Sequence, residues 1–180
     1  MSKKKIYFAG PWFTAAQAER EQRLIARLRE LGFEVFSPRE SSNITGSFAD
    51  PAVQKATFEG NIVNIDTCDI LFAVTDGKRG TCIEPDQDGR PMQAIDAGTM
   101  VEVGYAYHAR RISGKKPVMV YYAETLGKAS FNLMLSQSAD ITITDVYDGD
   151  TLVETAFERL AHLPAWIEND IKVAYNGRIE

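Results

Sequence analysis

Residues 96–107 have the sequence DAGTMVEVGYAY. Asp96 is a favourable helix N-cap, and the small and apolar residues after it predict a hydrophobic helix that packs against a sheet. Glu102 places a carboxylate on this helix, and Gly98 and Ala106, four residues to either side, leave space beside it on the same face. Because helical side chains lean toward the N-terminus, we expect Glu102 to point back toward Asp96 and a ligand cleft.

The same two acidic residues also have a purely structural interpretation. Asp96 would then serve only as a helix cap, and Glu102 would only pair with a nearby Arg or Lys. Structural ion pairs are common in proteins, so spacing alone leaves both interpretations open.

Length and composition indicate one ordinary globular domain. The chain has 180 residues, 44% of them hydrophobic and 25% charged. We therefore expect a single domain over residues 1–180, with a core at about 4–163 and a C-terminal tail at 164–180. The net charge of −5 argues against a nucleic-acid partner, because binding to phosphates requires a basic surface.

Membrane insertion and metal binding also lack a signal in the sequence. No apolar run approaches the ~20 residues of a membrane-spanning helix. Cys68 and Cys82 have no metal-binding spacing with His108 or His162, and two thiols in such a chain indicate a reducing compartment. We expect a cytoplasmic protein without a metal or another cofactor.

Apolar runs alternate with helical patterns along the chain. The predicted strands are residues 4–10, 33–36, 69–74, 118–122 and 140–143. The predicted helices are residues 15–31, a helix that begins at Pro51, the helix that starts at Asp96, a short helix at 131–135 and an amphipathic helix at 152–163. The apolar stripe of the helix that begins at Pro51 consists of Val53, Ala56, Phe58, Ile62 and Ile65. Long loops at 37–50 and 75–95 are expected to border the site.

This alternation predicts an α/β fold of the flavodoxin-like, doubly wound type. Strands joined by helices of more than about ten residues pair in parallel, here as a five-stranded sheet with helices on both faces. Ligands of such sheets bind at the carboxyl ends of the strands.

The candidate site residues are carboxylates and aromatic side chains. Neither a Gly-x-Gly-x-x-Gly loop, a Walker loop, a nucleophilic Ser elbow nor a Cys-His pairing is present. Such a set suits the recognition of sugars and bases, in which carboxylates hold hydroxyls or act as nucleophiles and aromatic faces stack on rings. The residues are Tyr7, Trp12, Phe13, Asp76, Asp96 and Glu102.

The chain resembles the nucleoside 2-deoxyribosyltransferase family. The resemblance spans about residues 4–140 and rests on the motifs Ile6-Tyr7-Phe8-Ala9-Gly10-Pro11-Trp12-Phe13, Asn61 with Cys68-Asp69, Asp96-x-Gly98-Thr99-x-x-Glu102-x-Gly104 and Asn132-Leu133-Met134. It implies a flavodoxin-like pentosyltransferase of nucleoside metabolism and nucleotide salvage. Such an enzyme moves 2-deoxyribose from a 2′-deoxynucleoside to a free purine or pyrimidine base with retention of configuration.

The resemblance also implies roles for individual residues. Glu102 would attack C1′ and form a covalent deoxyribosyl-glutamate, Tyr7 would position it, and Asp96 would hold the sugar. Asn132 would reach the 5′-hydroxyl in a neighbouring subunit's site, which implies a homo-oligomer, a dimer or a trimer of dimers, with shared active sites. The expected substrate-binding residues are Trp12, Phe13, Asn61, Asp76, Gly98, Asn132 and Met134.

Asn61 departs from some members of the family, which have an aspartate there. An amide hydrogen-bonds a base but does not act as a general acid, so the proton donor to the leaving base stays open between Asp76 and Asp96.

Two other functions remain open at this point. One is a related hydrolase that cleaves 2′-deoxynucleoside 5′-monophosphates, although Pro11-Trp12-Phe13 and Asn132 suit a free hydroxyl better than a phosphate dianion. The other is a non-catalytic nucleoside or nucleotide sensor on the same fold, since a fold does not determine a function.

Overall fold

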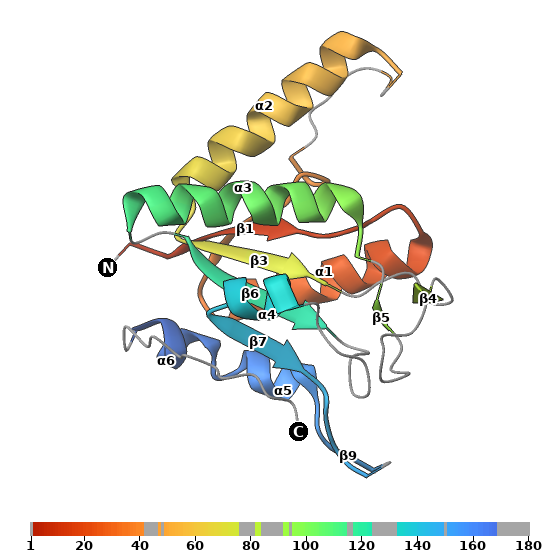
Figure 1. Ribbon diagram of the computed structural model, residues 1–180, viewed down its shortest axis with the longest axis vertical. Coiled ribbons are helices and arrows are strands. Elements are labelled where there is room, and N and C mark those ends of the chain that lie inside the picture. The colour runs from red at the N-terminus through yellow and green to blue at the C-terminus, as the bar shows by residue number, and fades with distance from the viewer. Residues whose placement is uncertain are drawn as a thin grey trace.

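The protein folds as three layers, a central sheet with helices on each side, in the computed structural model (Figure 1). The structure describes residues 2–41, 47, 49–75, 82–83, 92–93, 95–114, 117–123, 133–149 and 151–168. In the described part of the chain, no helix is both long and apolar enough to cross a membrane.

The central sheet has five parallel strands in the order β2-β1-β3-β6-β7. The prediction of a flavodoxin-like, doubly wound sheet is confirmed, because the chain leaves β1 toward β2 on one side and β3 on the other. The strands are β1 (Lys5–Ala9), β2 (Glu34–Phe36), β3 (Ile70–Val74), β6 (Val118–Ala123) and β7 (Ile141–Thr144).

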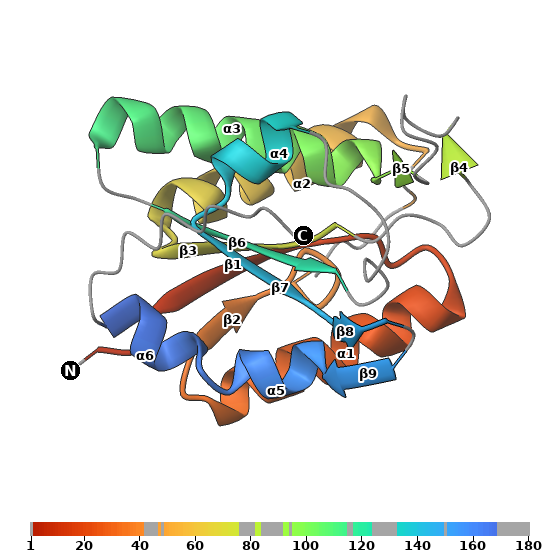
Figure 2. The same ribbon diagram turned by 60° about the horizontal axis from the view of Figure 1, so that its bottom comes forward.

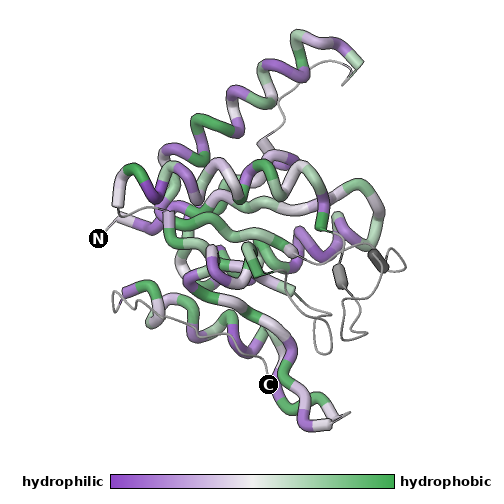
Figure 3. Tube along the Cα trace, viewed as in Figure 1, coloured by the Kyte–Doolittle hydropathy of each residue, from purple (hydrophilic) through white to green (hydrophobic). Residues whose placement is uncertain are grey.

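Continuous apolar runs form the central strands because helices cover both faces of the sheet. All five residues of β3 and four of the five residues of β1 are buried. Figure 3 shows hydrophobic residues concentrated along these strands. The sheet therefore separates two apolar clusters, one under each helical layer.

In the described part of the chain, helices cover both faces of the sheet (Figure 2). The first layer holds α2 (Pro51–Thr67), α3 (Ala97–Ser113) and α4 (Leu133–Ser138). The second layer holds α1 (Ala15–Glu30), α5 (Ala156–Leu160) and α6 (Leu163–Glu168).

Local capping signals explain where the long helices begin and end. Thr14 starts α1 with a capping box to Gln17, and Asp50 caps α2 in front of Pro51. The helix α3 ends at Gly114, whose φ of 74° is left-handed and therefore suits glycine.

The predicted amphipathic helix at 152–163 is wrong over its first residues and correct over 156–160, which are helical. The chain instead forms an antiparallel hairpin of β8 (Val146–Asp148) and β9 (Thr151–Glu154), and helix α5 begins only at Ala156. Gly149 adopts a positive φ of 62° at the turn, and Thr155 forms a capping box with Glu158, so the turn and the cap outweigh the helical periodicity.

Three other predicted segments need correction. The segment 75–95 holds two short paired strands, β4 (Cys82–Ile83) and β5 (Met92–Gln93), and most of its other residues lie outside the described part of the chain. The predicted tail at 164–180 contains most of α6, whose Trp166 packs against the core. The short helix α4 runs over 133–138, not over 131–135.

The predicted apolar stripe of α2 is buried only at its C-terminal end. Ile65 lies in the core, whereas Phe58 is 54% exposed. A helix of 17 residues is about 25 Å long, and a strand of five residues only about 17 Å, so α2 extends beyond the sheet (Figure 1). The outward apolar residues of α2 are thus left without cover from the described part of this chain.

Candidate active site

Tyr7 and Glu102 meet at the point where the sheet topology reverses. Tyr7 lies on β1 and is fully buried, while Glu102 lies on α3. The Tyr7 hydroxyl donates a hydrogen bond of 2.6 Å to Glu102 Oε1. The fold thereby joins residues 95 positions apart, at the switch point between β1 and β3 where ligands bind in doubly wound sheets.

The surroundings of Glu102 hold its pKa well above that of an ordinary glutamate. Burial of the carboxyl group raises its pKa to about 7, the Tyr7 hydrogen bond acts in the opposite direction, and the negative charge of Asp96 adds to the rise. Burial and the neighbouring Glu102 also raise the pKa of Tyr7, so its phenol remains a neutral donor. Glu102 therefore changes charge near neutral pH.

No arginine or lysine pairs with Glu102 among the described residues, where Tyr7 is its hydrogen-bond partner. This part of the purely structural interpretation is therefore wrong for the described chain. A carboxylate that is partly withdrawn from water and supplied with one hydroxyl donor is suited to nucleophilic attack or to proton transfer.

Asp96 caps α3, as predicted. Its negative charge also acts on Glu102, whose pKa it raises. Its Oδ2 atom accepts a hydrogen bond of 2.8 Å from the Thr99 backbone N–H. A Cβ atom at Gly98 would lie 3.1 Å from this oxygen, so glycine lets the carboxylate sit close to the helix end. Capping and a role in the site are thus compatible at Asp96.

Two residues that were not predicted as site residues contact Tyr7 and Asp96. Phe36 stacks on Tyr7 with ring centroids 5.5 Å apart, and Thr99 bonds Asp96 with its hydroxyl as well as its backbone. The spacing of Thr99, three residues after Asp96 and three before Glu102, was visible in the sequence. The Phe36 contact depends on the strand register that pairs it with Tyr7.

Three other predicted site residues lie on segments that follow β1 or on α2. Trp12 and Phe13 follow β1 and stack on each other at 5.4 Å, with Phe13 70% exposed. Asn61 is half-buried on α2, one turn before Ile65 and on the same helical face. None of these three has a hydrogen bond or ring contact with the Tyr7–Glu102 pair among the described contacts.

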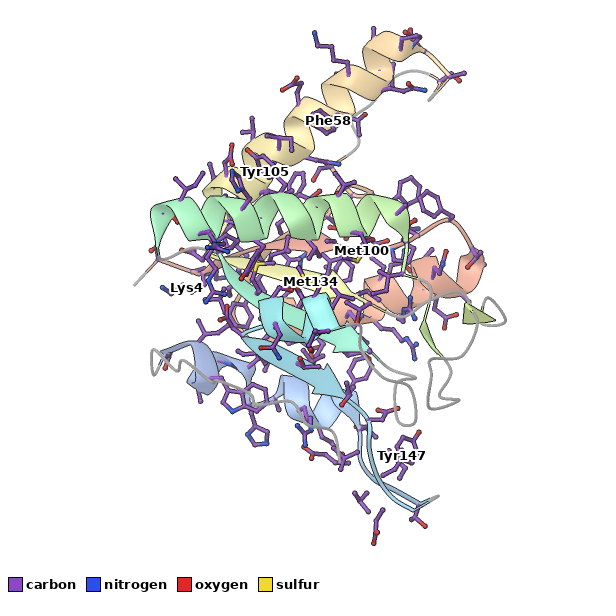
Figure 4. All side chains as sticks on the ribbon, viewed as in Figure 1. Lys4, Phe58, Met100, Tyr105, Met134 and Tyr147 are labelled. Atoms are coloured by element: carbon purple, nitrogen blue, oxygen red, sulfur yellow. The ribbon has the colours of Figure 1, made fainter. Side chains whose placement is uncertain are left out.

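Met134, labelled in Figure 4, lies on α4 and is 78% exposed. In the same view, Tyr105 lies between α3 and α2, where its hydroxyl donates to Asp66 at 2.9 Å and ties the two helices together. Asp76 and Asn132 lie outside the described residues.

Comparisons with known proteins identify the family of the chain. The sequence model of the family described as nucleoside 2-deoxyribosyltransferase matches residues 6–147. A search of curated proteins finds no match.

Among solved structures, the chain is similar to the 2-deoxyribosyltransferase of Bacillus psychrosaccharolyticus. The sequences are 25% identical over 81% of this chain and 93% of that one, with a TM-score of 0.61. The 2-desoxiribosyltransferase of Leishmania mexicana is 21% identical over 93% of this chain and 99% of that one, with a TM-score of 0.51, and supports the fold alone. The family match covers most of the sequence and includes Tyr7, Asp96 and Glu102. The chain therefore belongs to the nucleoside 2-deoxyribosyltransferase family.

Proposed function

We propose that the protein transfers a 2-deoxyribosyl group from a 2′-deoxynucleoside to a free purine or pyrimidine base, as a pentosyltransferase of nucleoside salvage in the cytoplasm. The observation that carries the proposal is the 2.6 Å hydrogen bond from buried Tyr7 to Glu102, within a chain of this family. Glu102 is the nucleophile, and Tyr7 fixes the direction of its carboxylate.

The reaction proceeds as a double displacement with retention. In the first step, a Glu102 oxygen forms a bond to C1′ while the bond from C1′ to the base nitrogen breaks, and the leaving base takes up a proton. In the second step, a nitrogen of the acceptor base attacks C1′, the ester bond to Glu102 breaks, and the acceptor base releases a proton. Glu102 is then again a free carboxylate.

The remaining site residues bind the substrate. The negative charge of Asp96 stabilises the oxocarbenium-like transition state, and its carboxylate holds a sugar hydroxyl. Trp12 and Phe13 supply faces for stacking on the base, and Asn61 and Met134 complete the contacts. The proton for the leaving base comes from Asp76 or from Asp96; if it comes from Asp96, that carboxyl group is protonated beforehand and carries its negative charge only after it has given up the proton.

We further propose that the enzyme is a homo-oligomer in which Asn132 and Met134 serve a neighbouring subunit's site. Six large hydrophobic residues are exposed on the α2–α3–α4 layer, whereas α1, α5 and α6 expose none in the described part of the chain. The six are Phe58, Val63, Val101, Ile112, Leu133 and Met134. Outside the helices, Phe13 and the β8–β9 hairpin also expose apolar side chains, so the α2–α3–α4 layer differs in this respect only from the other helical layer. Its six exposed apolar residues favour burial against a second copy.

An exchange assay tests the function. The protein is incubated with a 2′-deoxynucleoside and a different free base, and intact-protein mass is measured with the deoxynucleoside alone. We expect a new deoxynucleoside, a protein heavier by one deoxyribosyl group, and slower turnover of the matching ribonucleoside and 5′-monophosphate. Cleavage of the monophosphate without transfer would support the hydrolase instead, and unchanged mass with binding would support the sensor.

Mixed oligomers test the shared site. Chains with Glu102→Ala and with Asn132→Ala are co-expressed; each heterodimer should then contain one intact site and regain up to about half of the wild-type activity. The control pairs Glu102→Ala with Asp96→Asn, two changes in the same chain's cleft, and should give only the mean of its parents. If verified hetero-oligomers of the test pair also give only the mean, the shared site is wrong.

A further inference from the structure

Thr99 lies between the two carboxylates of the site. It follows Asp96 by three residues and precedes Glu102 by three, so it lies one helical turn before Glu102 on the same face. Its side chain is only 1% exposed. Both of its donors reach the same atom, because the backbone N–H and the Oγ1 hydroxyl donate to Asp96 Oδ2 at 2.8 and 3.1 Å.

The second of these bonds exceeds what a helix cap requires. Asp50 caps α2 through one hydrogen bond of 2.8 Å, from the backbone N–H of Ala52 to its Oδ1. The hydroxyl bond of Thr99 therefore adds a second constraint on Asp96 Oδ2, beyond the backbone N–H that caps the helix.

The two bonds leave one oxygen of Asp96 available. Among the described residues, Asp96 Oδ2 accepts both hydrogen bonds and Oδ1 accepts none. A Cβ atom at residue 98 would lie only 3.1 Å from Asp96 Oδ2, so glycine at this position gives Oδ2 its room beside the helix end. The Thr99 hydroxyl donates to Asp96 and not to Glu102, which keeps Tyr7 as its donor.

We infer that Thr99 is a positioning residue for Asp96, fixing Oδ2 at the helix end so that Oδ1 faces the sugar of the substrate. This inference rests on the proposed function and adds a residue to it. Thr99 does not touch the substrate, and its effect on the reaction passes through Asp96.

A double-mutant cycle tests the inference. Thr99→Val removes the hydroxyl and retains the shape and the backbone cap, so kcat/KM for the 2′-deoxynucleoside should fall about tenfold, as expected for a lost bond to a charged group. Thr99→Ser retains the hydroxyl and should restore kcat/KM to within about twofold of wild type. In an Asp96→Asn background, Thr99→Val should cause no further loss.

Thr67→Val is the matched control, because the Thr67 hydroxyl also bonds within a helix, to Val63 O at 3.0 Å. Thr67 ends α2 just before β3 begins, at the edge of the sheet opposite the carboxyl ends of the strands. Thr67→Val should leave kcat/KM unchanged. A tenfold loss that persists in the Asp96→Asn background, or a Thr99→Ser enzyme as slow as Thr99→Val, would show that Thr99 acts independently of Asp96. If Thr99→Val fails to fold, the Thr99→Ser and Thr99→Ala pair in both backgrounds gives the same test.

The covalent labelling of the wild type separates this inference from the proposed function. If the wild type forms no covalent deoxyribosyl-enzyme, the proposed function and the role of Thr99 are both overturned. With labelling and a Thr99→Val enzyme that equals the wild type, only the role of Thr99 is wrong.

Discussion

Glu102→Gln is expected to lower kcat/KM for base exchange by at least about 10⁴-fold and to eliminate the covalent deoxyribosyl-enzyme. An amide retains the size of the side chain and accepts the Tyr7 hydrogen bond, but it is not a nucleophile. The measurements are the exchange rate and the intact-protein mass. Glu19→Gln, on the exposed surface of α1, is the control and should leave both unchanged. Transfer by Glu102→Gln at near the wild-type rate would remove Glu102 from its proposed role.

The same variant should be more stable than the wild type at alkaline pH. The folded-state pKa of Glu102 is raised from 4.5 to about 7, so folding favours the protonated form. The wild type has this contribution in full below about pH 4.5 and loses it as the pH rises through about 7. Glutamine does not ionise, so Glu102→Gln should exceed the wild type in free energy of unfolding by about 1–3 kcal/mol at about pH 8 and match it at about pH 4. Denaturant unfolding at the two pH values checks the difference, and a variant less stable at the higher pH would contradict it.

Tyr7→Phe is expected to lower kcat/KM about 10²-fold and to shift its pH dependence. The Tyr7 hydrogen bond favours the charged form of Glu102, so its loss raises the pKa of Glu102 above about 7. Because attack on C1′ requires the ionised carboxylate, the acidic limb of the pH profile of kcat/KM should move to higher pH.

Tyr121→Phe is the matched control for this change. Tyr121 is also buried under the same helical layer and hydrogen-bonds Ser138 at 2.7 Å, a contact separate from Glu102. It should leave the acidic limb in place. An unshifted limb in Tyr7→Phe, or an equal shift in Tyr121→Phe, would mean that the Tyr7 hydroxyl does not control the ionisation of Glu102.

Local signals of the sequence predict most of the fold. Apolar runs mark the five strands of the main sheet, and Pro51, Asp96 and Gly32 mark helix ends to within about a residue, because caps and buried strands depend on neighbours along the chain. The hairpin of β8 and β9 was not predicted, because the helical pattern of the segment conceals the turn at Gly149 and the helix cap at Thr155.

Part of the candidate site could likewise be predicted from local sequence. Asp96, Gly98 and Glu102 stand on one helix, so their spacing alone indicated a small-residue face beside a carboxylate. The resemblance of the chain to its family then suggested Tyr7 as the partner of Glu102.

The sequence by itself determined the α/β class, the order of the main-sheet strands and of the long helices, and the helix that Asp96 caps and that carries Glu102. Only the tertiary structure decided that Tyr7 reaches Glu102 across 95 positions, that Phe36 stacks behind it, and that α2 extends beyond the sheet. The physical reason is that hydrogen bonds and ring contacts across strands depend on register, and the raised pKa of Glu102 depends on burial. Register and burial arise only when segments distant in sequence pack together.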